Sequence, residues 1–303
     1  MVPQGMAQGF FKKLRLALDM IKFEHSVFAL PFALTGALLA VRQDGFAGQG
    51  LAWKFLWIVI AMAGARSAAM AFNRVLDADI DARNPRTSQR HLPSGILSRR
   101  FAWSAVVGAS VVFFLAAGAL NPLCLRLAPV ALAIVFCYSF TKRFTAFSHL
   151  VLGFSLGMAP AAAWIAVRGS LDPRILLLTA AVSLWTAGFD VIYACQDYEF
   201  DLRESLFSLP KKLGIAGALW VARGLHLLML LCLLALVASF GLGALSLAGL
   251  AVVSLLIAYE HSLVKADDLS RVDAAFFTVN GWVSVLFFLF WAADILFFSR
   301  RGA

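Results

Sequence analysis

The sequence predicts an all-α polytopic membrane protein with nine transmembrane helices packed in one bundle. Of its 303 residues, 61% are hydrophobic and only 14% are charged, and the charges gather in short clusters between long apolar runs. An apolar run of about 20 residues is long enough to cross a bilayer as a helix. No low-complexity segment or linker interrupts the pattern, so we expect residues 1–303 to form a single domain.

Each apolar run is expected to form one membrane-spanning helix. Residues 1–24 mix basic and apolar side chains, which predicts an amphipathic segment at the membrane surface ahead of the first span. The nine predicted spans are residues 25–41, 53–76, 101–120, 122–140, 148–167, 173–196, 219–240, 243–260 and 274–298. The many Phe (27) and Trp (8) residues suit side chains that face lipid or the membrane interface.

Basic residues predict the orientation of the bundle. Lys and Arg are concentrated before the first span and after spans two, four, six and eight, whereas the other loops carry few. The positive-inside rule therefore places the N-terminus and these loops in the cytoplasm, and we expect a multi-pass protein of the inner (cytoplasmic) membrane. These loops also account for the net charge of +9, so we expect the lipid bilayer but no nucleic acid and no obligate protein partner.

One stretch at the end of the second span organises the chemistry. Asn73, Asp77 and Asp81 are spaced four residues apart and so point from one helix face. Oxygen ligands at the mouth of a membrane bundle suit Mg²⁺, which in proteins is commonly bound together with substrate phosphates. Asp197 and Asp201 repeat this spacing about 120 residues later, again at a predicted cytoplasmic end.

The two acidic clusters indicate an internal repeat. An offset of four helices returns the chain to the same side of the membrane, which predicts two four-helix halves plus a ninth span. In this alignment Tyr193 corresponds to Asn73, and Tyr138 corresponds approximately to Tyr259. Acidic residues where a helix leaves the membrane can simply be solvated. Carboxylates four residues apart repel each other, however, and two such clusters on one side favour a cationic ligand, such as two Mg²⁺ ions bridged by a diphosphate.

Further polar residues lie near the same mouth. Tyr138 and Lys142 are four residues apart at the end of the fourth span, where they either bind phosphate oxygens or anchor the helix at the interface. Arg66 and Asp190 each lie seven residues before a cluster, about 10 Å deeper at about 1.5 Å per residue. They either pair with each other or serve the substrate. The histidines show no metal spacing and are interpreted as structural or interfacial.

These motifs resemble the UbiA family of membrane prenyltransferases. The matching residues are Asn73-x-x-x-Asp77-x-x-x-Asp81, Tyr138-x-x-x-Lys142-Arg143, and Asp190 with Tyr193, Asp197 and Asp201. Arg74 stands where the family usually has Asp, which leaves one fewer acidic ligand. The segments around Glu24, Asn73 and Tyr259 look most like a bacterial branch labelled 4-hydroxybenzoate polyprenyltransferase, some members of which are assigned to the futalosine route to menaquinone.

The resemblance implies Mg²⁺-dependent transfer of a polyprenyl group from its diphosphate to an aromatic ring. Asp190, Asp77 and Asp197 would be catalytic. The implied metal ligands are Asn73, Asp77, Asp81, Asp197 and Asp201. The implied diphosphate-binding residues are Arg74, Arg86, Tyr138, Lys142, Arg143 and Tyr193. Arg66 and Asp190 would bind the acceptor.

The acceptor is expected to carry a ring carboxylate, because a buried Arg66 needs an anion. Candidates are 4-hydroxybenzoate and a hydroxynaphthoate, which would place the enzyme in ubiquinone or menaquinone biosynthesis. Three alternatives remain open: a UbiA branch with a non-aromatic or tetrapyrrole acceptor, a membrane transporter or lipid carrier with an acidic ion site, and a membrane diphosphate phosphatase.

Overall fold

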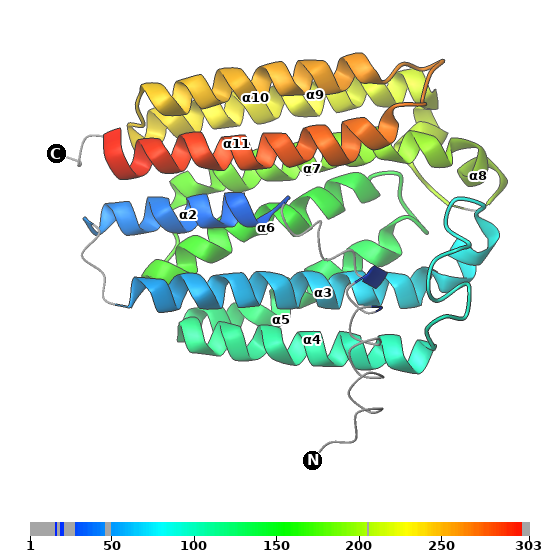
Figure 1. The fold of residues 1–303 in the computed structure, drawn as a ribbon, viewed down its shortest axis with the longest axis horizontal. Coiled ribbons are helices and arrows are strands. Elements are labelled where there is room, and N and C mark those ends of the chain that lie inside the picture. The colour runs from blue at the N-terminus through cyan, green and yellow to red at the C-terminus, as the bar shows by residue number, and fades with distance from the viewer. Residues whose placement is uncertain (1–15, 17–18, 21–27, 46–49, 205, 299–303) are drawn as a thin grey trace.

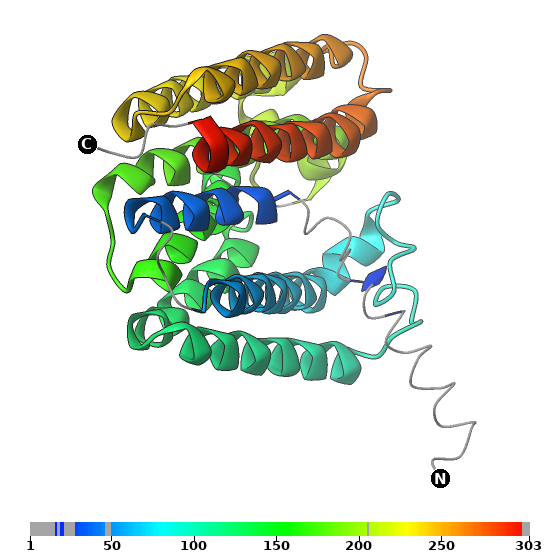
Figure 2. The same ribbon diagram turned by 60° about the vertical axis from the view of Figure 1, so that its left-hand side comes forward.

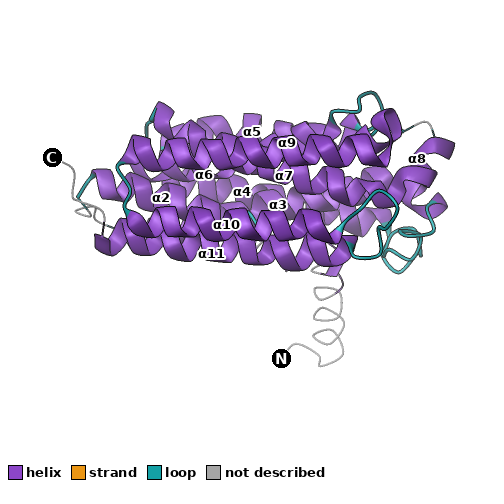
Figure 3. Ribbon diagram, turned by 90° about the horizontal axis from the view of Figure 1, so that it is seen from above, coloured by secondary structure: helices purple, strands orange, loops and turns teal. Residues whose placement is uncertain are grey.

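A computed structural model describes residues 16, 19–20, 28–45, 50–204 and 206–298, and within these ranges it contains helices but no strand. The long helices lie side by side in one bundle (Figures 1 and 3). They are α2 (Leu30–Gln43), α3 (Leu51–Arg83), α4 (Arg99–Leu120), α5 (Pro122–Thr141), α6 (Ser148–Arg168), α7 (Leu176–Ala194), α9 (Leu209–Phe240), α10 (Ala244–Leu263) and α11 (Asn280–Ala293).

The predicted nine-helix bundle is confirmed for the described residues. Eight helical segments are long and apolar enough to cross a membrane, and α2 is a shorter apolar helix beside them. The amphipathic segment predicted for residues 1–24 lies almost entirely outside the described residues. The predicted bounds were too short at two polar ends, because hydropathy detects only the apolar part of a helix: α3 continues to Arg83, and α9 begins at Leu209.

The early start of α9 has a local cause. The Ser208 side chain accepts a hydrogen bond from the backbone N–H of Lys211, and Pro210 occupies the first turn, where its missing N–H costs nothing. Gly214 then bends the helix with a φ of 71°, a backbone conformation that residues other than glycine rarely adopt. The apolar part of α9 follows this bend.

Helices α6 and α7 form the centre of the bundle. In the apolar stretch that contains α7, 67% of the residues are buried inside the protein. In α4 and in α5 this share is 17%, which leaves most of their side chains to face lipid. Gly153 and Gly157 let α6 approach α7 closely: a Cβ atom would lie 2.2 Å from the Ser183 carbonyl oxygen at Gly153 and 2.0 Å from Ser183 Oγ at Gly157. Small residues four apart are a common means of close helix packing in membranes.

One end of the bundle carries most of its irregular structure. The loop after α3 and the short helix α8 (Tyr198–Arg203) lie together at this end (Figures 1 and 2). Helix α3 stops at Arg83 because Asn84 is extended and precedes Pro85, which disfavours helix for the residue before it. Thr87 Oγ1 then donates to the Asp81 carbonyl oxygen at 3.0 Å, so the loop folds back over the end of α3.

Candidate active site

A polar cavity of about 240 Å³ opens at this end of the bundle. It is bounded by α3, α5, α6 and α7, by the 3₁₀ turn and short helix that follow α7, and by the loops after α3 and after that short helix. Its lining includes the predicted site residues Asn73, Arg74, Asp77, Asp81, Arg86, Tyr138, Lys142, Asp190, Tyr193, Asp197 and Asp201. The structure therefore brings both acidic clusters to a single cavity.

Asp77 is held by donors from two helices. Its side chain is 3% exposed, and Asn73 Nδ2 donates to its Oδ2 at 2.9 Å from the preceding turn of α3. From the end of α5, Lys142 Nζ lies 2.5 Å from Oδ2 and Arg143 donates to Oδ1 at 2.9 Å. Arg143 thus contacts Asp77, although it does not line the cavity that the described residues form.

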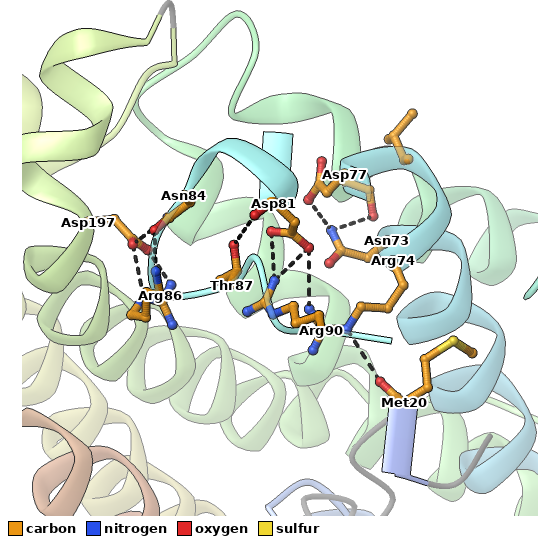
Figure 4. A network of polar contacts seen from close by, with 12 residues as sticks. Met20, Asn73, Arg74, Asp77, Asp81, Asn84, Arg86, Thr87, Arg90 and Asp197 are labelled. Carbon is orange, nitrogen blue, oxygen red and sulfur yellow. Dashed lines mark hydrogen bonds and ion pairs between the residues drawn. The ribbon is translucent and has the colours of Figure 1, made fainter. Parts of the chain in front are cut away.

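Asp81 lies one turn further along α3 and faces two arginines (Figure 4). Arg90, on the loop after α3, donates to both carboxylate oxygens at 2.8 Å. Arg74 lies 4.0 Å away and also donates to the Met20 carbonyl oxygen at 3.3 Å. The residue that replaces the family's usual Asp is thus a cation beside the first acidic cluster.

Asp197 connects the second cluster to the loop after α3 (Figure 4). Arg86 forms two hydrogen bonds to its carboxylate, at 3.0 and 2.5 Å, and Asn84 Nδ2 adds a third at 3.0 Å. Arg86 also donates to the Tyr193 hydroxyl at 2.9 Å. Partial burial acts to lower the pKa of Arg86, but the hydrogen bond and charge of Asp197 raise that pKa above its ordinary value.

The second cluster differs from the predicted repeat of the first. Helix α7 ends at Ala194, and a 3₁₀ turn (Cys195–Asp197) precedes α8, so Asp197 and Asp201 do not lie on one continuous α-helix as Asp77 and Asp81 do. Both still line the cavity. Tyr138 and Tyr259, which correspond approximately in the predicted repeat, do not occupy equivalent positions in the structure. Tyr138 lines the cavity, whereas Tyr259 is 50% exposed on α10.

Asp190 lies in the wall of the cavity with a partner that sequence analysis missed. His149 Nδ1 is 2.7 Å from Asp190 Oδ2, and both residues line the cavity. The sequence predicts a structural or interfacial role for His149 because the histidines show no metal spacing, and no sequence spacing relates it to Asp190, 41 residues away. Asn84 and Ser139 were also missed; a polar residue directly before Pro85 was the available signal for Asn84.

Arg66 is partly buried in α3 and makes no hydrogen bond to Asp190. Its Nε atom is buried and has no hydrogen-bond partner among the described residues, and it does not line the cavity that they form. Asp190 pairs with His149, so the first of the two alternatives, an Arg66–Asp190 pair, is not found in the described part of the chain. The guanidinium of Arg66 retains unused hydrogen-bonding capacity within the bundle.

The donor set around the cavity fits a hard divalent cation. Asn73, Asp77, Asp81, Asp197 and Asp201 offer carboxylate and amide oxygens, the ligands that Mg²⁺ prefers. They stand in two groups, and three of the four carboxylates accept hydrogen bonds from Arg or Lys. Among the residues that the structure describes, no three acidic, His or Cys side chains converge closely enough to form a metal site by themselves.

Comparison with known proteins identifies the family. The model of the UbiA prenyltransferase family matches residues 29–283, which is most of the chain. This protein belongs to the UbiA prenyltransferase family. It is therefore a prenyltransferase by family, and the transporter and phosphatase interpretations are not retained.

Two curated relatives of this UbiA protein carry the same name. The 4-hydroxybenzoate octaprenyltransferase of Vibrio cholerae serotype O1 is 32% identical over 218 residues, which cover 71% of this chain and 75% of that protein. The 4-hydroxybenzoate octaprenyltransferase of Ectopseudomonas mendocina is 34% identical over 255 residues, 83% of each chain.

Solved structures agree with the UbiA fold. The apo structure of a UbiA homologue from Aeropyrum pernix K1 has a TM-score of 0.81 and 36% identity, covering 90% of this chain and 99% of that one. A UbiA homologue from Archaeoglobus fulgidus, bound to DMAPP and Mg²⁺, has a TM-score of 0.67 at 19% identity, covering 92% and 98%. At that identity the second likeness concerns the fold alone.

Proposed function

We propose that this UbiA protein transfers a polyprenyl group from a polyprenyl diphosphate to an aromatic carboxylic acid, with Mg²⁺ as cofactor. The favoured acceptor is 4-hydroxybenzoate, and a hydroxynaphthoate is the second candidate; these would place the enzyme in ubiquinone or menaquinone biosynthesis respectively. The observation that carries the proposal is the single cavity in which two acidic clusters and Asp190 meet. The relatives named 4-hydroxybenzoate octaprenyltransferase support the acceptor class.

The diphosphate would bind at the acidic end of the cavity. Asn73, Asp77, Asp81, Asp197 and Asp201 would hold Mg²⁺, which supplies charge neutralisation to the leaving diphosphate. The carboxylate and amide oxygens of these five residues are the ligand type that Mg²⁺ prefers. Arg74, Arg86, Tyr138, Lys142 and Tyr193 line the same space, so they are available to donate hydrogen bonds to phosphate oxygens, and Arg143 lies beside them on Asp77.

The acceptor would react deeper in the bundle, next to Asp190. The bond between the allylic carbon and the diphosphate oxygen breaks, and its electron pair leaves on the diphosphate. A π electron pair of the ring forms the new carbon–carbon bond. The proton on the substituted ring carbon is then lost, which restores aromaticity. In this proposal Asp190, which lines the cavity, would accept that proton.

The test uses the purified full-length protein with Mg²⁺ and a polyprenyl diphosphate. Aromatic acids are offered one at a time, together with a phenol that lacks a carboxylate, and products are identified by mass spectrometry. We expect a prenylated 4-hydroxybenzoate or hydroxynaphthoate. If diphosphate is released but none of the acceptors is prenylated, the proposal is contradicted.

If the acceptor carries a carboxylate, we expect Arg66 to bind it. A buried guanidinium nitrogen without a partner is costly, and a carboxylate would supply the missing acceptor. Arg66→Ala should therefore raise the KM for the aromatic acid by about tenfold or more, the loss expected for a charge-assisted hydrogen bond, while the KM for the prenyl diphosphate changes little. Steady-state kinetics with each substrate varied in turn provides the measurement.

Arg126→Ala is the matched control for Arg66, since Arg126 is an exposed arginine on α5 outside the cavity lining. A larger effect of Arg66→Ala on the prenyl diphosphate than on the acid would exclude acceptor binding by this residue. Efficient prenylation of a phenol without a carboxylate would remove the reason for an acidic acceptor.

The charged loops make a prediction about orientation. We propose that the cavity opens to the cytoplasm, because the loops at its end are the basic ones. Gln89→Cys, exposed in the loop after α3, should be shielded from an impermeant thiol reagent added to intact cells. Ser170→Cys, exposed at the opposite end of α6, should react; both are made in a background without the exposed Cys137. The reverse labelling pattern would invert the orientation.

A further inference from the structure

His149 connects three separate parts of the bundle at the cavity wall. It is the second residue of α6, its side chain is 5% exposed, and its Nδ1 lies 2.7 Å from Asp190 Oδ2 on α7. Its other ring nitrogen, Nε2, lies 3.4 Å from the backbone nitrogen of Leu209, the first residue of α9. The imidazole is therefore engaged at both nitrogens.

The backbone contact determines which nitrogen carries the proton. A backbone N–H can only donate, so Nε2 of His149 must offer its lone pair to Leu209. The single proton of the neutral ring is then on Nδ1, from which it is donated to Asp190 Oδ2. Asp190 Oδ2 accepts this hydrogen bond, which leaves Oδ1 as the carboxyl oxygen that can take up a proton.

The same geometry leaves one side of Asp190 available. Its side chain is 24% exposed and lines the cavity, and the described residues provide no hydrogen bond to it other than that of His149. The lone pair of His149 is not available, because Leu209 occupies it. Of the two side chains, only Asp190 can receive a proton from a molecule in the cavity.

We propose that His149 is a positioning residue that fixes the tautomer of the pair and aims the free oxygen of Asp190 at the acceptor. This rests on the proposed function, in which Asp190 takes the proton released from the substituted ring carbon. The transferred proton goes to Asp190 and leaves the Nδ1–H of His149 in place, so no further co-reactant is required. The arrangement follows the general pattern in which a histidine or carboxylate orients the group that reacts.

Two substitutions separate positioning from packing. His149→Leu removes both hydrogen bonds, and should lower kcat by about tenfold or more, as expected when a reacting group loses its orientation. The KM for the prenyl diphosphate should stay nearly constant, because no phosphate-binding contact changes. His149→Gln offers an amide N–H to Asp190 and an amide oxygen to Leu209, so it should recover most of kcat. If His149→Leu does not fold, His149→Met provides the same test.

His226→Leu is the matched control. His226 is 1% exposed and contacts the Trp185 carbonyl oxygen and His261, outside the lining of the cavity. Its loss should lower the midpoint of thermal unfolding without changing kcat. Kinetics of both substrates and the unfolding midpoint are measured for every variant, with the wild type in the same assay.

The outcomes distinguish the two levels of the proposal. A wild type that prenylates no aromatic acid overturns the proposed function and this inference with it. An active wild type whose kcat is unchanged in His149→Leu overturns the inference alone. A loss that His149→Gln does not recover, or an equal rise in the KM for the prenyl diphosphate, assigns His149 a packing role and also overturns it.

Discussion

Asp77→Ala should reduce prenyl transfer by about 100-fold or more, which is the scale of losing one group that stabilises transition-state charge. Asp77 is the most extensively bonded carboxylate of the first cluster and a ligand in the proposed Mg²⁺ site. Without it, Lys142 and Arg143 also lose their shared anion. Turnover at saturating prenyl diphosphate and a range of Mg²⁺ concentrations measures the loss.

Asp79→Ala is the control for Asp77 because it lies two residues away on the same helix. Its side chain is 73% exposed and pairs with Arg99, outside the lining of the cavity, so turnover should be unchanged. Asp77→Asn keeps the side-chain volume, and equal losses in the Asn and Ala variants would show that charge matters rather than packing. Normal activity of Asp77→Ala, or of the wild type in EDTA, would falsify the metal assignment.

Gly157→Leu should destabilise the bundle by about 3 kcal/mol or more, at or above the usual cost of overpacking a core. A Cβ atom there would meet Ser183 Oγ at 2.0 Å and the Thr179 carbonyl oxygen at 2.7 Å. The hydroxyl can rotate away, but the backbone oxygen can retreat only if α6 and α7 separate. His149 and Asp190 are on these two helices, so activity should fall together with stability.

The measurement for Gly157 is the thermal unfolding midpoint in detergent, followed by the monodisperse fraction on gel filtration. Gly108→Leu is the control: Gly108 is exposed on α4, and a Cβ atom there meets nothing within 4 Å. That variant should unfold close to the wild-type temperature. Equal stability of the two variants would mean that the α6–α7 contact is not tightly packed.

Local patterns explain which parts of the site sequence analysis recovered. Asn73, Asp77 and Asp81 lie on one face because helix periodicity alone sets their directions, and α3 is unbroken through all three. The same reasoning was wrong for Asp197 and Asp201, since it assumed an unbroken helix where the chain forms a 3₁₀ turn. Both clusters reach one cavity because an even number of membrane crossings separates them.

Contacts between distant segments could not be predicted in this way. The bond from Arg86 to Asp197 spans 111 residues, and that from His149 to Asp190 spans 41. Each depends on how loops and helices pack in three dimensions, and neither leaves a periodic trace in the sequence. The Arg66–Asp190 pair, one of the two alternatives for these residues, is not found in the described part of the chain, because equal depth along two helices does not mean that the side chains face each other.

The pairing of charges in the cavity has a thermodynamic consequence for ligand binding. The lining contains five carboxylates, from Asp77, Asp81, Asp190, Asp197 and Asp201, and four cations, from Arg74, Arg86, Arg90 and Lys142. A cation arriving alone must compete with the arginines and lysine, and an anion arriving alone must compete with the carboxylates. When both bind together, the cation takes the carboxylates and so frees the arginines and the lysine for the anion, and the anion likewise frees the carboxylates for the cation. We therefore expect positive linkage between Mg²⁺ and the diphosphate: each should tighten the equilibrium binding of the other by the same factor.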